Sequence, residues 1–229
     1  MKRKAYAISA TIAALALLAF GVVSATAGSP SSAPAGSPHS HAAHATQAQG
    51  LTQSDLRSLL GRQLGEHAAL AMNATNLSVT GSPAFPAAAK ALDRNSVALS
   101  KSITAVYGKA AGKAFLDGKF QWRAHIGFFV DYTVAVAKKD KAGQNRAVAN
   151  LMRHTVEHGK LLGGATGLSP KVVQNDLLAH VLELKGQLDA YSNKQYAKAT
   201  KIYQDAYAHM FATGDLLAKA ISEQKNLPK

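Results

Sequence analysis

The sequence predicts an all-α domain, an up-down helical bundle of four long helices plus extra helices. After residue 51, apolar residues recur at spacings of three and four, which is the period of one buried helical stripe. No stretch of useful length alternates apolar and polar residues as a half-buried strand would. The chain has no cysteine, so packing must supply its stability without disulfides. These observations predict one helical core.

The first 27 residues have the three parts of a secretory signal peptide. Residues 2–4 are basic, residues 10–23 are largely apolar, and residues 25–27 read Ala-Thr-Ala, a small-residue cleavage site. The apolar run is shorter than the roughly 20 residues that span a bilayer. We therefore expect cleavage after Ala27 and a protein that is secreted or associated with the cell wall.

A linker separates the signal peptide from the helical domain. Residues 28–50 consist mostly of Ser, Pro, Ala, Gly and His without a large apolar residue, so we expect a disordered tether. Its His39, His41 and His44 follow the pattern H-x-H-x2-H, a weak chelator of copper, nickel or zinc. The helical bundle domain then covers residues 51–229, a length that suits a single core.

The helix boundaries follow from capping and breaking residues. Thr52 or Ser54 can cap the first helix, Gly108 ends the second, and Ser169-Pro170 is typical of a helix start. The predicted helices cover residues 52–76, 87–107, 109–116, 120–139, 142–162 (ending before Gly163-Gly164), 170–192 and 194–225.

Two segments of the chain point to a possible internal duplication. Ala124-His125-Ile126 with Asp131 and Ala208-His209-Met210 with Asp215 both read A-H-[IM]-x4-D. If the match is not a chance one, each half contributes two helices with one inward histidine apiece, and the bundle has approximate twofold symmetry.

The charge of the chain is strongly basic. The formal net charge is +13, and 13 minus the three basic residues of the expected signal peptide leaves +10. This balance favours anionic wall polymers or a membrane surface as partners, whereas no nucleic-acid-binding module accompanies it. The alternative is a set of solvated helix faces with a basic bias. The lysines concentrate in two clusters: Lys138, Lys139, Lys141; and Lys194, Lys198, Lys201.

Histidines carry the clearest functional signal. His67, His125, His180 and His209 each lie in the apolar stripe of their own predicted helix. Imidazole is the commonest protein metal ligand, and four inward imidazoles on separate helices could surround one copper or zinc ion. The alternative is that each is a core histidine bonded to a backbone carbonyl or a tyrosine.

A ligating imidazole needs its second nitrogen held, usually by a carboxylate. Asp176 and Glu183 flank His180 at i−4 and i+3, which predicts that they hold its ring. By the same reasoning, we expect Glu66 to support His67 and Asp205 to support His209; these four acids complete the predicted site.

His154 and His158, at i and i+4 of one helix, form a weaker candidate pair that can chelate a divalent ion on an exposed helix; the alternative, which the sequence favours, is two surface histidines without a metal. Thr155 follows the first histidine where a metalloprotease motif needs glutamate. No glutamate precedes a histidine by three residues, which disfavours a diiron carboxylate site. The sequence contains no nucleophile elbow and no phosphate-binding glycine loop. It therefore does not establish whether the protein is an enzyme, and it favours a protein that is not one.

The segments 122–132 (WRAHIGFFVDY) and 206–211 (AYAHMF) with Gly214-Asp215 carry a resemblance. The chain resembles a family of uncharacterised secreted bacterial helical-bundle proteins, some of which are attached to copper amine oxidase N-terminal-like modules. The resemblance covers about residues 51–221. It implies a helical fold, export and prominence of the four stripe histidines. It implies no amine oxidase activity, because the catalytic domain and its cofactor-forming tyrosine motif are missing from this sequence.

Three functional hypotheses follow. The first is a secreted metal-binding bundle that holds copper or zinc on inward histidines. The second is a non-catalytic cell-surface or matrix module that binds anionic wall polymers through lysine-rich faces. The third is a small-molecule carrier with a pocket lined by aromatic residues, the alternative being that they only form the core: Trp122, Phe128, Phe129, Tyr203 and Tyr207.

Overall fold

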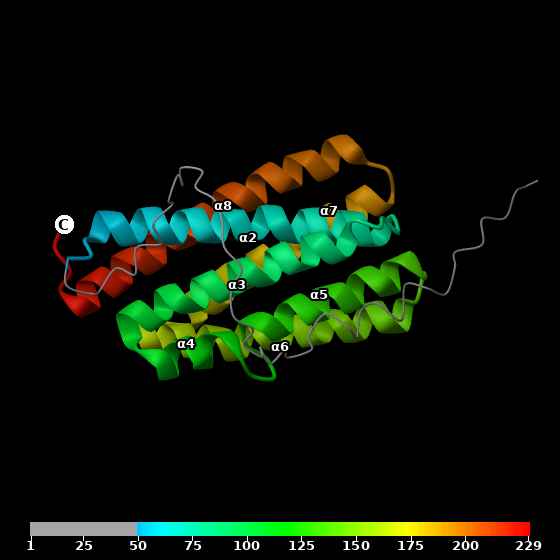
Figure 1. Ribbon diagram of the computed structural model, residues 1–229. Helices are drawn as coiled ribbons and strands as arrows, with labels where there is room; N and C mark the ends of the chain where they lie inside the picture. Colours follow the sequence, from blue (N-terminus) through cyan, green and yellow to red (C-terminus); the bar gives the residue numbers. More distant parts are fainter. Residues whose placement is uncertain (1–49) are drawn as a thin grey trace, which may run out of the picture.

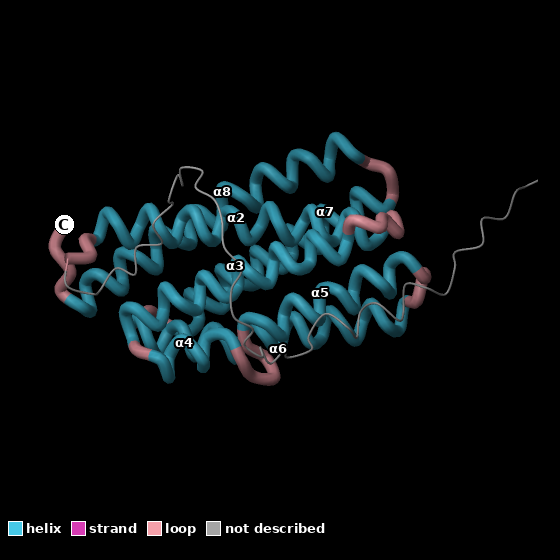
Figure 2. Tube along the Cα trace, viewed as in Figure 1, coloured by secondary structure: helices cyan, strands magenta, loops and turns pink. Residues whose placement is uncertain are grey.

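The computed structural model describes residues 50–229, and all regular structure within them is helical (Figures 1 and 2). The prediction of an all-α bundle is confirmed. The expected signal peptide, the linker and its three histidines lie outside the described residues. The helices are α2 (Gln53–Val79), α3 (Phe85–Tyr107), α4 (Lys109–Leu116), α5 (Trp122–Ala137), α6 (Lys141–Thr166), α7 (Pro170–Ser192) and α8 (Tyr196–Lys225).

The long helices run lengthwise and are joined by short turns, so consecutive helices pack as neighbours (Figure 1). Helix α2 lies against α3 and α8 and also reaches α5 and α7, which makes it the central element. Thr52 begins α2 with a capping box in which its hydroxyl accepts from the Asp55 amide. The end of the chain returns to this point, where the Gln53 amide donates to the Pro228 carbonyl at 2.7 Å.

Helices α2 and α8 cross with their backbones almost touching. A Cβ placed on Gly214 of α8 would lie 2.6 Å from the backbone nitrogen of Gly61 in α2, so only glycine fits there. On one side of this contact, Phe211 lies over Gly61 and Tyr207 lies over Gly65, while the outer surfaces of both rings stay exposed. The inner stripe of α8 is therefore built largely from small residues.

Helix α6 is longer than the sequence predicts. We expected Gly163-Gly164 to end it, but α6 continues to Thr166 and is capped by Gly167, whose φ of 76° is left-handed. Gly163 instead permits a close contact, because a Cβ there would lie 2.8 Å from the Cα of Pro170 at the start of α7.

The core is apolar for most of its length but contains an unusual polar layer. Leucines, alanines and aromatic rings from α2 to α8 form its main cluster. Five histidines from four helices lie in the same interior, each at most 3% exposed: His67, His125, His154, His158 and His180.

Within residues 50–229, no helix combines the length and the apolar character needed to cross a membrane.

Candidate metal centre

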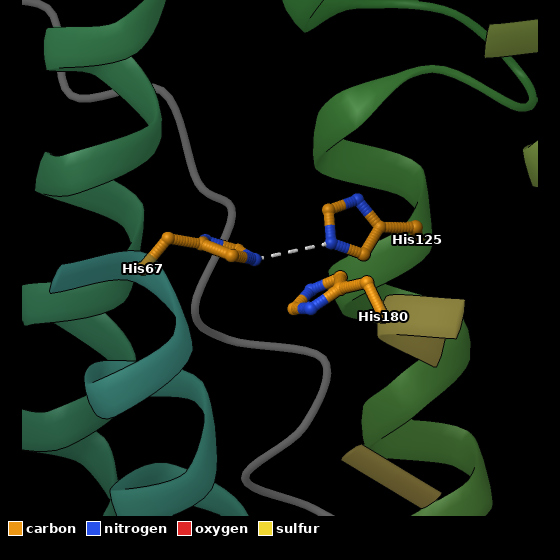
Figure 3. Close-up of side chains that lie close together, drawn as sticks. All are labelled: His67, His125 and His180. Carbon is orange, nitrogen blue, oxygen red and sulfur yellow. Dashed lines mark hydrogen bonds between the residues drawn. The ribbon is translucent and has the colours of Figure 1, made fainter. Parts of the chain in front are cut away.

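Three imidazoles from three different helices meet in the interior of the bundle. His67 comes from α2, His125 from α5 and His180 from α7, and Figure 3 shows their rings facing a common point. One nitrogen from each ring lies within 4.8 Å of the corresponding nitrogen of the other two. The Nε2 atoms of His67 and His125 are 3.4 Å apart. Three buried histidines of this chain could therefore hold a metal ion.

The separations of these nitrogen atoms fit a small transition-metal ion. A tetrahedral ion with bonds of about 2.0–2.1 Å to imidazole holds neighbouring nitrogens about 3.3 Å apart. The 3.4 Å between His67 and His125 is close to that value and is long for a hydrogen bond between nitrogens. At the outer limit of 4.8 Å, each nitrogen would have to move inward by less than about 1 Å.

Burial keeps the three imidazoles in the neutral form that binds metals. Desolvation, helped by the nearby His154, lowers the pKa of His67 to about 3. Burial is also the main reason that the pKa values of His125 and His180 lie well below the usual range. A ring that is neutral at ordinary pH presents a free nitrogen lone pair without first losing a proton.

The five core histidines carry most of the buried side-chain atoms that have no hydrogen-bond partner within residues 50–229. His180 has no hydrogen-bond partner at either ring nitrogen, and His67 and His125 have none at Nδ1. Leaving a buried polar atom unpaired costs about 1–3 kcal/mol. An ion bound at Nε2 of His67 and Nε2 of His125, the two atoms that lie 3.4 Å apart, would give one nitrogen of His180 a partner but would leave the two Nδ1 atoms unpaired.

A second row of imidazoles, His154 and His158 of α6, extends the cluster. We expected this pair on an exposed surface, but the two rings are buried, and the ring of His154 stacks on that of His125 with centroids 4.6 Å apart. The loop before α5 orients them: His154 Nδ1 donates to the Phe120 carbonyl at 2.8 Å, and His158 Nδ1 donates to Gln121 Oε1 at 2.6 Å. With Nδ1 as the donor in each ring, Nε2 carries the lone pair.

The sequence contains a signal for this buried placement of His154 and His158. His154 and His158 fall in the stripe that Ala147, Leu151 and Leu162 define at spacings of three and four. Burial lowers the pKa of His154 to about 4 and that of His158 well below its usual range. All five core imidazoles are therefore neutral at pH 7.

His209 does not join the other three, although the sequence placed it with them. Its ring lies between α7 and α8, where Nδ1 is 2.8 Å from Glu183 Oε2 and Nε2 is 3.3 Å from Asp176 Oδ1. These two hydrogen bonds raise the pKa of His209 to about 10, so the ring is a cation at pH 7. A protonated imidazole bonded at both nitrogens has no lone pair for a metal.

The four acids expected behind the histidines have other partners, which corrects that prediction. Asp176 and Glu183 lie on the same helix as His180 but hold His209 from the neighbouring helix, and Thr213 also donates to Asp176 at 2.9 Å. Of the other two acids, Glu66 accepts a hydrogen bond from Asn95, and Asp205 forms an ion pair with Lys201. Three of the four acids therefore reach across helix interfaces, whereas Asp205 pairs with Lys201 along its own helix.

Aromatic rings enclose the imidazoles. Trp122 is the only tryptophan of the chain, and its ring centroid lies 4.7 Å from that of His67 and 4.9 Å from that of His125. Phe115 of α4 packs against Trp122 and His158. The five aromatic residues predicted to line one carrier pocket do not do so, because Trp122 is buried here while Tyr207 lies at the surface with 43% exposed.

The His125 and His209 segments, which suggested an internal duplication, occupy different environments. His125 is in the interior beside His67, whereas His209 is ion-paired near the surface. The two histidines therefore do not have equivalent positions in the bundle.

Comparisons of the chain with protein-family models, with curated proteins and with solved structures gave no match. The resemblance carried by residues 122–132 and 206–215 stays a prediction.

Proposed function

We propose that this protein is a metal-binding helical bundle that holds one copper or zinc ion on His67, His125 and His180. The observation that carries the proposal is the convergence of one nitrogen from each of three helices within 4.8 Å in a buried, neutral cluster. Neutral imidazole suits zinc and copper, and the chain has no cysteine that could form a thiolate site.

The charge of the site favours copper in its cuprous state. None of the three ligands is a carboxylate, so a divalent ion would leave two uncompensated positive charges in the core. Burying charge without a partner is costly, and the solvation cost of an ion rises with the square of its charge. A monovalent ion therefore costs least, and zinc would need an additional anionic ligand.

We also propose that the protein works outside the cytoplasm, secreted or associated with the cell wall. The support is the sequence of residues 1–27, in which three basic residues precede a short apolar run and a small-residue cleavage site. Expression of the full chain in a bacterial host, followed by mass determination of the exported protein, would test this. A protein retained in the cytoplasm with residues 1–27 intact would contradict it.

A titration of the untagged full chain tests the metal site. The linker histidines are first replaced, as His39→Ser, His41→Ser and His44→Ser, so that they do not bind metal. Elemental analysis after dialysis gives the stoichiometry for copper and zinc. Copper is added as the cuprous ion and kept reduced with ascorbate. Trp122 lies beside two of the proposed ligands, so a change in its fluorescence reports binding at this site.

Single substitutions then locate the ion. We expect one ion per chain in this background, and a loss of at least about tenfold in affinity with His67→Ala or His180→Ala, since one removed ligand contact is worth more than 1.4 kcal/mol. His209→Ala is the matched control and should bind like the parent, because His209 is engaged by Asp176 and Glu183. Equal binding by all three variants, or none by the parent, would reject the site.

A second candidate function, binding of anionic wall polymers, is favoured by a specific groove. At the end of the bundle where the α5–α6 and α7–α8 turns meet, a groove of about 660 Å³ is lined by Lys139, Lys141 and Lys194. A fourth lysine there, Lys185, is paired with Asp189 at 2.6 Å and adds little net charge.

Binding to purified wall material tests this candidate. Because the lysines are exposed, binding should weaken as salt rises, and replacing the three unpaired groove lysines by alanine should remove it. A control variant carries three exposed lysines of other helices replaced by alanine, which removes the same charge, because none of them has an ion pair within residues 50–229: Lys101, Lys109 and Lys171. If both triple variants lose binding equally, the groove has no special role.

A further inference from the structure

A pocket of about 580 Å³ lies between α2, α3 and α5, and it ends on the metal centre. His67 and His125 form part of its lining, and His125 keeps 3% of its surface exposed. Pockets that bind small molecules have volumes of about 300–1,000 Å³. This pocket is therefore large enough for a ligand that reaches the imidazoles from outside.

The walls of the pocket suit an apolar molecule. At Gly127 of α5, a Cβ would meet no atom within 4 Å, so this residue leaves open space in the pocket. The rim has little net charge, because Arg123 pairs with Asp93 at 2.9 Å and with Asp117 at 3.3 Å. The other two charged residues of the lining, Lys90 and Asp131, have opposite signs. The apolar side chains of the wall include Ala71, Leu92, Ile126, Phe129 and Val130.

The inner end of the pocket adjoins the place where a bound ion would be positive and unpaired. The site has three neutral imidazoles and no carboxylate. Three protein ligands leave one coordination position of a four-coordinate ion open. An anionic group that enters from the pocket would fill that position and offset the buried charge.

We propose that the pocket binds a small carboxylic acid with an apolar body, whose carboxylate binds the ion held by His67, His125 and His180. The inference rests on the metal site proposed above. The apolar body contacts Ile126 and Phe129, and the ion provides the charge that the rim lacks.

Cobalt(II) is the probe, because its visible absorption reports the ligands of the ion. The full chain with the three linker histidines replaced by serine is loaded with cobalt and titrated with hexanoate, acetate and hexanol. Hexanoate should shift the cobalt bands and bind at least about tenfold more tightly than acetate, since each CH₂ group that is buried strengthens binding about fourfold. Hexanol lacks the carboxylate and should leave the bands unchanged.

A substitution in the wall tests the location. Gly127→Leu should fill the pocket and weaken hexanoate binding at least about tenfold while cobalt binding persists. Gly164→Leu is the matched control, because Gly164 is also helical, faces open space and lies outside the pocket. If Gly127→Leu loses its helical circular dichroism, Gly127→Ala, which adds one methyl group, should show a smaller loss in the same direction.

The outcomes separate this inference from the metal site itself. A cobalt spectrum that hexanoate does not change, or that changes equally in the Gly127 and Gly164 variants, overturns the pocket inference and leaves the metal site standing. If the parent protein shows no cobalt absorption with or without hexanoate, the pocket inference is overturned, and if it also binds neither copper nor zinc, the metal site is overturned as well.

Discussion

Acidification of the metal-free protein should unfold it, because the core holds five imidazoles in their neutral form. An unfolded histidine has a pKa of about 6.5. The folded values are lower, about 3 for His67 and about 4 for His154, so below pH 6.5 the unfolded chain binds more protons than the folded one. Stability must then fall as the pH falls.

The size of the effect follows from these two residues. For each pH unit below 6.5, each buried histidine lowers the free energy of unfolding by about 1.4 kcal/mol, until the pH reaches the pKa of that histidine in the folded protein. At pH 5, His67 and His154 together lower the free energy of unfolding by about 4 kcal/mol, and burial of the other three rings acts in the same direction. Since domains are stable by only about 5–15 kcal/mol, we expect unfolding between pH 6 and pH 4.

Urea unfolding between pH 7 and pH 5, in the presence of a chelator, measures this loss. His154→Gln removes one titrating ring while its side-chain amide can still donate to the Phe120 carbonyl, so it should reduce the loss at pH 5 by about 2 kcal/mol. His209→Gln is the control of opposite sign, because the pKa of His209 is raised, and it should not reduce the loss. Equal stability of the parent at pH 7 and pH 5 would refute the reasoning.

Three further changes should alter stability in directions that the packing sets. Gly214→Ala should lower the free energy of unfolding by about 1–3 kcal/mol, because its Cβ would meet the backbone of Gly61. Gly164→Ala faces open space and should raise the free energy of unfolding by up to about 1 kcal/mol. Urea midpoints compare the two variants, and similar midpoints would contradict the close crossing of α2 and α8. His209→Ala should lower the free energy of unfolding by about 1–2 kcal/mol below pH 6.5, and this loss should disappear as the pH rises towards 10. Thermal unfolding at several pH values measures the loss. A loss that does not change with pH would exclude the ion pair as its cause. His180→Leu should stabilise the metal-free protein by about 1–3 kcal/mol, because two unpaired nitrogens are removed, and a destabilised variant in calorimetry would argue against their being unpaired.

The fold could be predicted because each helix carries its periodicity and most of its stop signals locally. The predicted ranges 109–116 and 170–192 match α4 and α7, whose ends are marked by Gly108, Asp117 and Pro170. The end of α6 could not be predicted in the same way. Gly163 looks like a helix stop in sequence, but its role is a contact with another helix.

The candidate site could be predicted in part, for the same reason. His67, His125 and His180 lie in clear apolar stripes, and they converge. His209 was misplaced because its ring lies against α7, where Asp176 and Glu183 bind it, and not in the histidine cluster. Which neighbouring helix a side chain meets depends on the packing of the bundle and not on the sequence of one helix.

The partners of the histidines were beyond reach of the sequence, because they depend on how neighbouring helices are rotated. The acids of α7 lie at suitable spacing from His180, yet their carboxylates point across the interface to His209. A rotation of one helix by a single residue, about 100°, exchanges such partners. Helical spacing thus restricts which residues share a face, and the packing of the helices determines which of them meet.

The polar core has a thermodynamic cost that packing does not explain. A leucine layer would fill the same volume without leaving the nitrogens of His180 unpaired, and it would not make the domain sensitive to acid. Residues that lower the stability of a fold are expected mainly where function requires them. Within residues 50–229 the unpaired nitrogens concentrate in one cluster, at the inner end of a pocket, and His209 has both ring nitrogens bonded. A bound ion would give His180 a partner at one of its two unpaired nitrogens and would convert part of the cost into binding energy.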